Sequence, residues 1–72
     1  HVHYAMGSNR QVDISLARVF CLLADVYFQE KRYSEAKERY ANALDLFRKR
    51  ADKDGMAVAM QGIGNCNIEI RF

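Results

Sequence analysis

Small and aromatic side chains alternate at helical spacing between residues 17 and 50, and this pattern constrains the fold more than any other feature of the chain. Two such runs are joined by the polar segment 29–32. Small residues let two helix backbones approach closely, and aromatic rings from the opposite helix fill the remaining space. The side chains expected along the seam between the two helices are Tyr27, Tyr33, Ala36, Tyr40 and Ala43. The pattern therefore predicts an antiparallel helical hairpin with surface left over for stacking on a neighbouring unit.

The predicted fold is all-α, with helices at about residues 13–29, 33–50 and 55–70. The expected N-terminal caps are Asp13, Ser34 and Asp54, because Asp and Ser oxygens accept hydrogen bonds from free backbone N–H groups at a helix start. No Pro interrupts the chain. Residues 13–72 are expected to form one small domain. The weakly patterned residues 1–12 are expected to be a poorly ordered or tag-derived segment.

The first predicted helix is apolar on nearly all sides. From Val19 to Phe28, only Asp25 is charged or polar in the usual sense. A helix that packs against a single partner shows one apolar stripe. We therefore expect this helix to be covered on two or three sides, by its own hairpin partner and by a neighbouring repeat, with any remainder exposed for a binding partner.

Length and charge exclude several classes of protein. With 72 residues the chain has a marginal core, since a domain of this size buries only about 60% of its unfolded surface. The net charge of +2 is too small to indicate nucleic-acid binding by itself. No stretch approaches the roughly 20 apolar residues of a membrane span. No secretory signal pattern is present, so the expected location is cytoplasmic.

No catalytic, cofactor or metal-binding constellation is evident in the sequence. There is no Gly-rich phosphate loop and no Ser grouped with His and an acid, so we expect neither an enzyme nor a bound cofactor. His1 and His3 could ligate a metal, but no third ligand is evident, and no metal is predicted. Cys21 and Cys66 are expected to be buried or half-buried free thiols on matching helices of neighbouring units.

The motif resembles the tetratricopeptide repeat family. Its successive slots are filled here by Phe20, Leu23-Ala24, Tyr27, Ala36, Tyr40 and Ala43-Leu44. Ala24 stands where the family has Gly, and Arg48 stands in the closing Pro slot. The resemblance implies a right-handed α-solenoid fragment, made of one hairpin and the first helix of a second repeat. It also implies a non-enzymatic scaffold or adaptor that binds a protein or peptide.

A second, incomplete copy of the motif follows the first. Ile63 repeats the register of Leu23 after 63 − 23 = 40 residues, against about 34 for the common repeat. The run Ile63-Gly64-Asn65, preceded by the loop 52–55, resembles the longer-spaced subclass with a Leu-Gly-Asn motif that occurs in kinesin light chains. The chain could therefore continue a longer array or pair with another copy, for instance by exchanging the third helix across residues 51–55.

Family register implies a concave groove lined by the first helices of successive repeats. The ligand-binding groove positions carried over are Arg18, Cys21, Leu22, Asp25, Phe28 and Gln29 of the first helix, and Val58, Gln61, Gly62, Asn65, Ile68 and Glu69 of the next copy. The amide of Asn65 could pair with a peptide backbone, and Gly62 would leave room for a close-lying ligand. Cys21, Leu22 and Asp25 do not supply the Lys, Asn and Arg of a carboxylate clamp. A partner with basic residues among apolar anchors fits better.

Two alternatives remain open on the sequence. The basic run from Arg48 to Lys53 could bind phosphate or nucleic acid in a small three-helix domain, although it also suits the negative end of a helix dipole. A three-helix microtubule-interacting-and-transport domain has similar hairpins and also binds helical peptides. If the chain were a domain of this second kind, its binding partner would differ, but it would still be a protein-interaction module.

Overall fold

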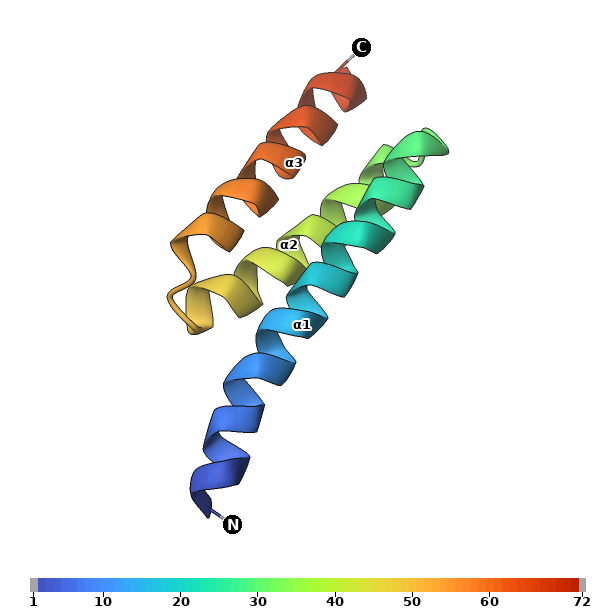
Figure 1. Cartoon of the computed structure of the whole chain (residues 1–72). Coiled ribbons are helices and arrows are strands. Elements are labelled where there is room, and N and C mark those ends of the chain that lie inside the picture. The colour runs from blue at the N-terminus through green and yellow to red at the C-terminus, as the bar shows by residue number, and fades with distance from the viewer. Residues whose placement is uncertain (1, 72) are drawn as a thin grey trace.

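The computed structural model describes the backbone of residues 2–71 and the side chains of residues 10–71. It contains three helices, α1 (Val2–Gln29), α2 (Tyr33–Lys49) and α3 (Lys53–Arg71), and no strand within the described residues (Figure 1). The helices form an elongated body of 50 × 19 × 13 Å. The predicted all-α hairpin with a further helix is confirmed. None of the helices over residues 2–71 is both long and apolar enough for a membrane span.

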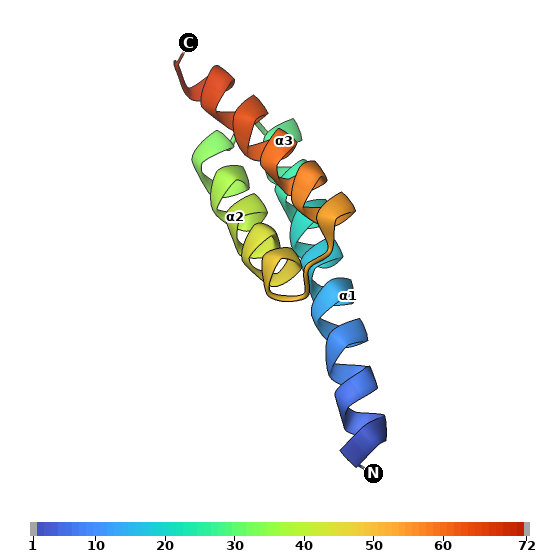
Figure 2. The same cartoon turned by 90° about the vertical axis from the view of Figure 1, so that its left-hand side faces the viewer.

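α2 is the central helix of the fold. α1 and α3 both pack extensively on α2 and barely touch one another. In Figure 1 α2 lies between α1 and α3, whereas in Figure 2 both of these helices lie on the same side of α2. In both views the first turns of α1 project beyond the other two helices. A groove between α1 and α3 therefore has α2 as its floor.

Two small clusters of buried residues hold the three helices together. One contains Ala17 of α1, Ala43 and Phe47 of α2 and Ala59 of α3, with Phe20 packed against it. The other contains Ala24, Ala36, Tyr40 and Cys66, with Tyr27 packed against it. Each cluster sets an aromatic ring of α2 among small residues of its neighbours. The predicted interlocking of Tyr27, Ala36 and Tyr40 is thus confirmed.

Two glycines let α3 lie close to α2. Gly55 and Gly62 are separated by two helical turns, as are the rings of Phe47 and Tyr40 on α2. A Cβ atom on Gly55 would overlap the Phe47 ring, and one on Gly62 would lie 2.6 Å from Cε1 of Tyr40. The aromatic rings of α2 therefore occupy the space that the two missing side chains leave.

The two interhelical turns have the same geometry. The N–H groups of Arg32 and Lys31 donate to the carbonyls of Tyr27 and Phe28, over 2.9 and 3.0 Å. In the second turn, the N–H groups of Asp52 and Ala51 donate to the carbonyls of Phe47 and Arg48, again over 2.9 and 3.0 Å. This is the Schellman pattern, which requires a left-handed residue directly after the helix. Lys31 (φ 64°) and Ala51 (φ 56°) take that conformation without being glycine.

The predicted start of the first helix near Asp13 is wrong, because α1 begins at Val2. Asp13 lies within the helix, and its side chain is used in a tertiary contact. Its Oδ2 accepts a hydrogen bond from Nε of Arg50 at 2.8 Å, and Nη2 of the same guanidinium lies 2.7 Å from this oxygen in an ion pair. Whether residues 1–12 are tag-derived stays a prediction.

The predicted caps of the other two helices also need correction. α3 begins at Lys53, and Asp52 rather than Asp54 caps it, since Asp52 Oδ1 accepts a hydrogen bond from the N–H of Gly55 at 3.2 Å. α2 has Arg32 at its N-cap position with no side-chain cap hydrogen bond, and Ser34 lies inside the helix. Arg32 instead binds Glu35, with Nε and Nη2 at 2.7 and 2.6 Å from its carboxylate oxygens.

The apolar surface of α1 is covered on one side only. α2 buries Ala17 and Ala24, whereas α3 makes little contact with α1. Large apolar side chains on the rest of α1 remain exposed, among them Leu22 at 64% and Val19 at 55%. The expected cover on two or three sides is therefore absent from the contacts between the described helices.

Candidate functional site

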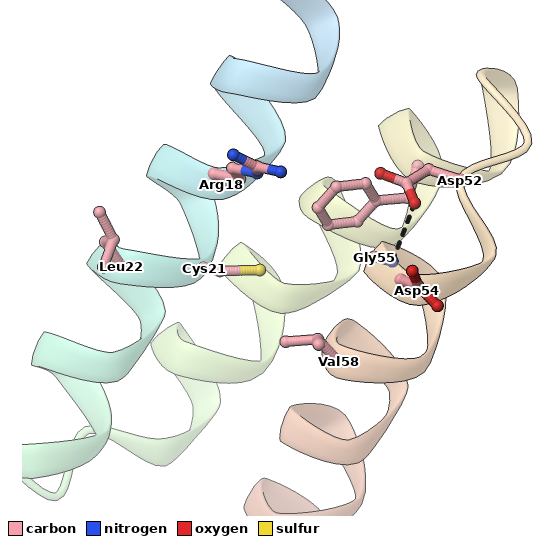
Figure 3. Close-up of a pocket in the computed structure, with 8 residues that line it drawn as sticks. Arg18, Cys21, Leu22, Asp52, Asp54, Gly55 and Val58 are labelled. Carbon is pink, nitrogen blue, oxygen red and sulfur yellow. Dashed lines mark hydrogen bonds between the residues drawn. The ribbon is translucent and has the colours of Figure 1, made fainter.

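A pocket of about 460 Å³ opens between α1 and α3, next to the turn that joins α2 to α3 (Figure 3). Its lining residues are Arg18, Cys21 and Leu22 of α1, Phe47 of α2, Asp52 of the turn, and Asp54, Gly55 and Val58 of α3. The three helices contribute to it together because α2 forms the floor and the other two helices form the walls. The volume lies within the range of about 300–1,000 Å³ that is typical of ligand-binding pockets.

The pocket has an apolar part and a charged end. Leu22 and Val58 stand on opposite walls and are 64% and 57% exposed. Arg18, Asp52 and Asp54 bring one positive and two negative charges to the end beside the turn. Asp52 also accepts the hydrogen bond that caps α3, which fixes its carboxylate at the pocket wall (Figure 3). The lining is therefore suited to an apolar side chain next to a basic one.

A partly buried polar contact joins α1 to α2 outside the pocket lining. The hydroxyl of Tyr40 donates a hydrogen bond to Oδ1 of Asp25. Burial, together with this carboxylate, raises the pKa of the Tyr40 hydroxyl. The Asp25 side chain is therefore engaged by α2, although the residue as a whole remains exposed.

Both thiols are kept in the neutral form. Burial raises the pKa of Cys21, and the neighbouring carboxylate of Asp25 raises it further. Burial also raises the pKa of Cys66, which is fully buried in the cluster around Tyr40. Both cysteines are free, as the sequence predicted. Neither has the depressed pKa of a reactive thiol.

The structure brings four of the sequence-predicted groove residues together in the pocket, namely Arg18, Cys21, Leu22 and Val58. Gln61, Asn65 and Ile68 are exposed on α3 outside the pocket lining. Phe28 packs edge-on against Tyr33 of α2, with ring centroids 5.1 Å apart. Gly62 is buried under the Tyr40 ring. The expectation that Gly62 leaves room for a ligand is wrong, because Tyr40 fills that room.

Sequence reasoning missed four lining residues, Phe47, Asp52, Asp54 and Gly55, as part of the groove. The reason is the misplaced start of the third helix. Once Asp52 is recognised as the cap, the first turn of α3 lies beside Phe47 and its two acids face the pocket. The signal was the Asp-x-x-Gly spacing, in which an Asp oxygen reaches the N–H three residues later.

The basic run from Arg48 to Lys53 is partly neutralised within the chain. Arg50 pairs with Asp13 at 2.7 Å, and Nζ of Lys49 lies 3.8 Å from the same carboxylate oxygen. Arg48 and Lys53 are exposed. The run therefore ties α2 to α1, which leaves less charge for a phosphate or nucleic acid.

Among the described side chains, no group of three His, Cys, Asp or Glu residues is placed to hold a metal ion. The side chains of His1 and His3 lie outside the described residues.

Comparison with protein-family models gives a match over most of the chain. A family model described as tetratricopeptide repeat matches residues 15–71, which span α2, α3 and the part of α1 that packs on α2. No curated protein and no solved structure matches the chain significantly.

Proposed function

Because the chain belongs to the tetratricopeptide repeat family, whose repeats are protein-interaction motifs, we propose that it binds a partner segment in the groove between α1 and α3. The observation that carries the proposal is the pocket formed by Leu22, Val58 and Phe47, with Asp52 and Asp54 at its end. Repeats of this family are generally non-catalytic, and the proposed role is accordingly that of a scaffold or adaptor.

The charge of the groove selects the proposed partner. Asp52 and Asp54 outnumber Arg18 at the pocket end, and Asp25 adds an acid farther along α1. A segment that places Lys or Arg beside an apolar anchor would pair its cation with these acids and bury its anchor between Leu22 and Val58. Charge complementarity of this kind chooses among partners more than it sets affinity.

We also propose that the chain belongs to the longer-spaced subclass of the family, as found in kinesin light chains. The 40-residue interval between Leu23 and Ile63 supports this (63 − 23 = 40), as does the run Ile63-Gly64-Asn65. Asn65 is exposed on α3, where its amide is free to meet a partner that lies across the helix. The proposed location is the cytoplasm, which a fluorescent fusion of the chain in cells would test.

The test of groove binding is a selection from a random peptide library displayed on phage, followed by titration of the enriched peptides. We expect enriched sequences to combine Lys or Arg with large apolar residues. Leu22→Glu should weaken their binding by at least about tenfold, because it places a charge on an apolar wall. Met60→Glu is the matched control, since Met60 is exposed on α3 outside the pocket lining. Acidic consensus peptides, or binding that Leu22→Glu leaves unchanged, would rule out this groove.

Self-association of two copies is the second proposed function. The observation that favours it is the apolar surface of α1, which neither α2 nor α3 covers. Each copy would then bind a second copy of the chain as well as a partner segment in its groove.

A further inference from the structure

The turn between α2 and α3 holds an alanine in a left-handed conformation. Ala51 has φ 56°, which is unfavourable for a residue with a Cβ atom and free of that penalty for glycine. Glycine is the usual residue at this position of a Schellman turn, yet residues 48–54 contain neither glycine nor proline. Most of them are Arg, Lys or Ala, which are strong helix formers. The sequence of the turn therefore suits a continuous helix better than a reversal of the chain.

α3 depends on α2 for nearly all of its packing. Ala59, Gly62 and Cys66 are buried on the side that meets α2, whereas α1 and α3 barely touch. If two copies exchanged α3, each α2 would lose these contacts and regain the same ones from the other copy. The structure thus names the occupant of the vacated face of α2, because that face already fits this helix.

The packed faces of α2 and α3 would fall on one side of a continuous helix. Successive residues of an α-helix are about 100° apart around its axis. Counted from Ala51, Phe47 and Tyr40 then lie about 40° and 20° to one side, and Gly55 and Gly62 lie about 40° and 20° to the other. These residues form the two contacts between ring and glycine that bring α3 close to α2. A single helix over residues 33–71 would therefore present one seam with Ala51 at its middle.

The turn between α1 and α2 lacks this property, although its geometry is the same. Lys31 is the left-handed residue there, with φ 64°. Counted from Lys31, Ala24 of α1 lies about 20° away around a continuous helix, whereas Tyr40 of α2 lies about 180° away. Ala24 and Tyr40 share one buried cluster in the hairpin, and a helix through this turn would place them on opposite sides. Exchange is therefore favoured at the second turn and not at the first.

The contacts between α2 and α3 are already symmetric about Ala51. Phe47 and Gly55 are each 4 residues from it (51 − 47 = 55 − 51 = 4), and Tyr40 and Gly62 are each 11 residues from it (51 − 40 = 62 − 51 = 11). In an antiparallel pair of continuous helices, Phe47 of one copy would therefore meet Gly55 of the other. The two Ala51 side chains would face one another at the two-fold axis, and such a pair closes at two copies.

Charges near this axis would be complementary. Arg48 and Asp52 lie on the same flank of the seam, about 60° and 100° from Ala51, and on opposite sides of it along the chain. In the antiparallel pair Arg48 of one copy would therefore lie beside Asp52 of the other. Lys49 and Lys53 lie about 160° from Ala51 and would face solvent. The charge pattern thus supports the antiparallel exchange.

We propose that the chain dimerises by exchanging α3, with residues 33–71 of each copy in one continuous helix and Ala51 as the hinge. The proposal rests on the self-association proposed above and gives it a route, which depends on the second turn and not on the exposed surface of α1.

The first experiment is sedimentation equilibrium of the full chain, refolded at increasing concentration, and of two glycine variants. The wild-type chain should approach twice its monomer mass of 8.3 kDa. Ala51→Gly should raise the dimer Kd by about 30-fold or more, because glycine relieves the unfavourable turn in both hairpins and so favours the monomer. Ala57→Gly is the matched control and should leave the Kd unchanged. Residue 57 is exposed and helical in α3, and it lies about 120° from Ala51 around a continuous helix.

The second experiment measures a distance within one chain. Spin labels are attached to Lys37→Cys and Asn65→Cys, two exposed positions, in a background of Cys21→Ala and Cys66→Ala. Lys37 lies near Cys66 in the hairpin, so the labelled positions should be about 10 Å apart, the spacing of neighbouring helices. In a continuous helix the 28 residues between them (65 − 37 = 28) span about 42 Å. Labelled chains are diluted with unlabelled ones, so that the two labels of each measured pair belong to the same chain.

The outcomes separate exchange from self-association itself. A wild-type chain that stays monomeric at every concentration overturns both. A dimer that keeps the short distance retains self-association and overturns the exchange. A dimer that Ala51→Gly leaves unchanged, or that both glycine variants weaken equally, overturns the hinge. A long distance together with selective weakening by Ala51→Gly supports the proposal, and circular dichroism of each variant shows that a loss of dimer is not a loss of folding.

Discussion

Gly62 of α3 lies so close to Tyr40 of α2 that a Cβ atom on the glycine would come within 2.6 Å of the tyrosine ring. Tyr40 is only 7% exposed and is held among Ala24, Ala36 and Cys66. The ring therefore has little freedom to move aside. The separation of α2 and α3, and with it the width of the groove above them, depends on the absence of a side chain at this position.

Gly62→Ala is expected to destabilise the domain by about 1–2 kcal/mol. Overpacking a filled core costs about 1–3 kcal/mol, and the better helix propensity of Ala offsets up to about 1 kcal/mol of this. Urea unfolding followed by circular dichroism measures the change. Gly64→Ala is the control, because a Cβ at Gly64 meets nothing within 4 Å. Gly64→Ala should raise the free energy of unfolding by up to about 1 kcal/mol. If Gly62→Ala also stabilised the domain, this would contradict the close approach of Gly62 to the Tyr40 ring.

The contact between Asp13 and Arg50 ties the start of the packed part of α1 to the end of α2. Both side chains are mostly shielded, at 20 and 27% exposure, and two guanidinium nitrogens share one carboxylate oxygen. Asp13→Ala should therefore cost about 1–2 kcal/mol, more than a fully exposed pair.

A double-mutant cycle isolates this ion pair. Asp13→Ala and Arg50→Ala are combined, and their coupling energy is read from thermal unfolding at low and high salt. Asp45→Ala is the control, since Asp45 is an exposed acid on α2 and should change stability by less than about 0.5 kcal/mol. A coupling energy near zero would mean that the pair contributes nothing to the docking of α1.

Ala51→Gly is expected to stabilise the chain by about 0.5 kcal/mol. The left-handed conformation of Ala51 costs an L-residue about 1–2 kcal/mol, whereas Gly adopts it freely but loses about 0.5–1 kcal/mol through its more flexible unfolded state. Thermal unfolding of the variant measures the balance. Ala57→Gly, at an exposed position inside α3, should instead destabilise by about 1 kcal/mol. A loss of stability in both variants would contradict the strained turn.

The hairpin could be predicted because the sizes of the side chains along the two helices indicate close packing. Tyr27, Ala36 and Tyr40 each fill or leave space in a way that only two close helices accommodate, and the structure brings them together. The three helices followed from the same local reasoning. The free thiols were predicted on other grounds, namely the expected reducing compartment and the lack of a partner at metal-ligand spacing.

The ends of the helices and the lining of the groove were less predictable, because they depend on tertiary contacts. Asp13 is a residue type that often caps helices, but its carboxylate instead accepts a hydrogen bond from Arg50 at the C-terminal end of α2. Gly62 looks open from its own helix, but Tyr40 of α2 fills the space. Sequence spacing within one helix carries no information on which residue of another helix arrives at that point.

Stability is expected to fall as the pH rises above about 9 to 10, where the thiols and hydroxyls of the unfolded chain begin to ionise. Burial raises the pKa of Cys21, Cys66 and Tyr40 in the folded chain, and the hydrogen bond to Asp25 raises that of Tyr40 further. The folded state therefore holds more protons than the unfolded state in alkaline solution. Linkage then requires that stability, fully present below these unfolded pKa values, be lost as the pH rises.

Tyr40→Phe tests how much of this alkaline loss comes from one hydroxyl. At neutral pH the variant should lose about 1 kcal/mol with the hydrogen bond to Asp25. Between about pH 8 and pH 11 its stability should fall less steeply than that of the wild type, because one titrating group is gone. Tyr27→Phe, in the same cluster, is the control for the loss of a hydroxyl. Urea unfolding across this range measures both slopes; equal slopes for Tyr40→Phe and the wild type would mean that Tyr40 ionises as readily in the folded chain as in the unfolded one.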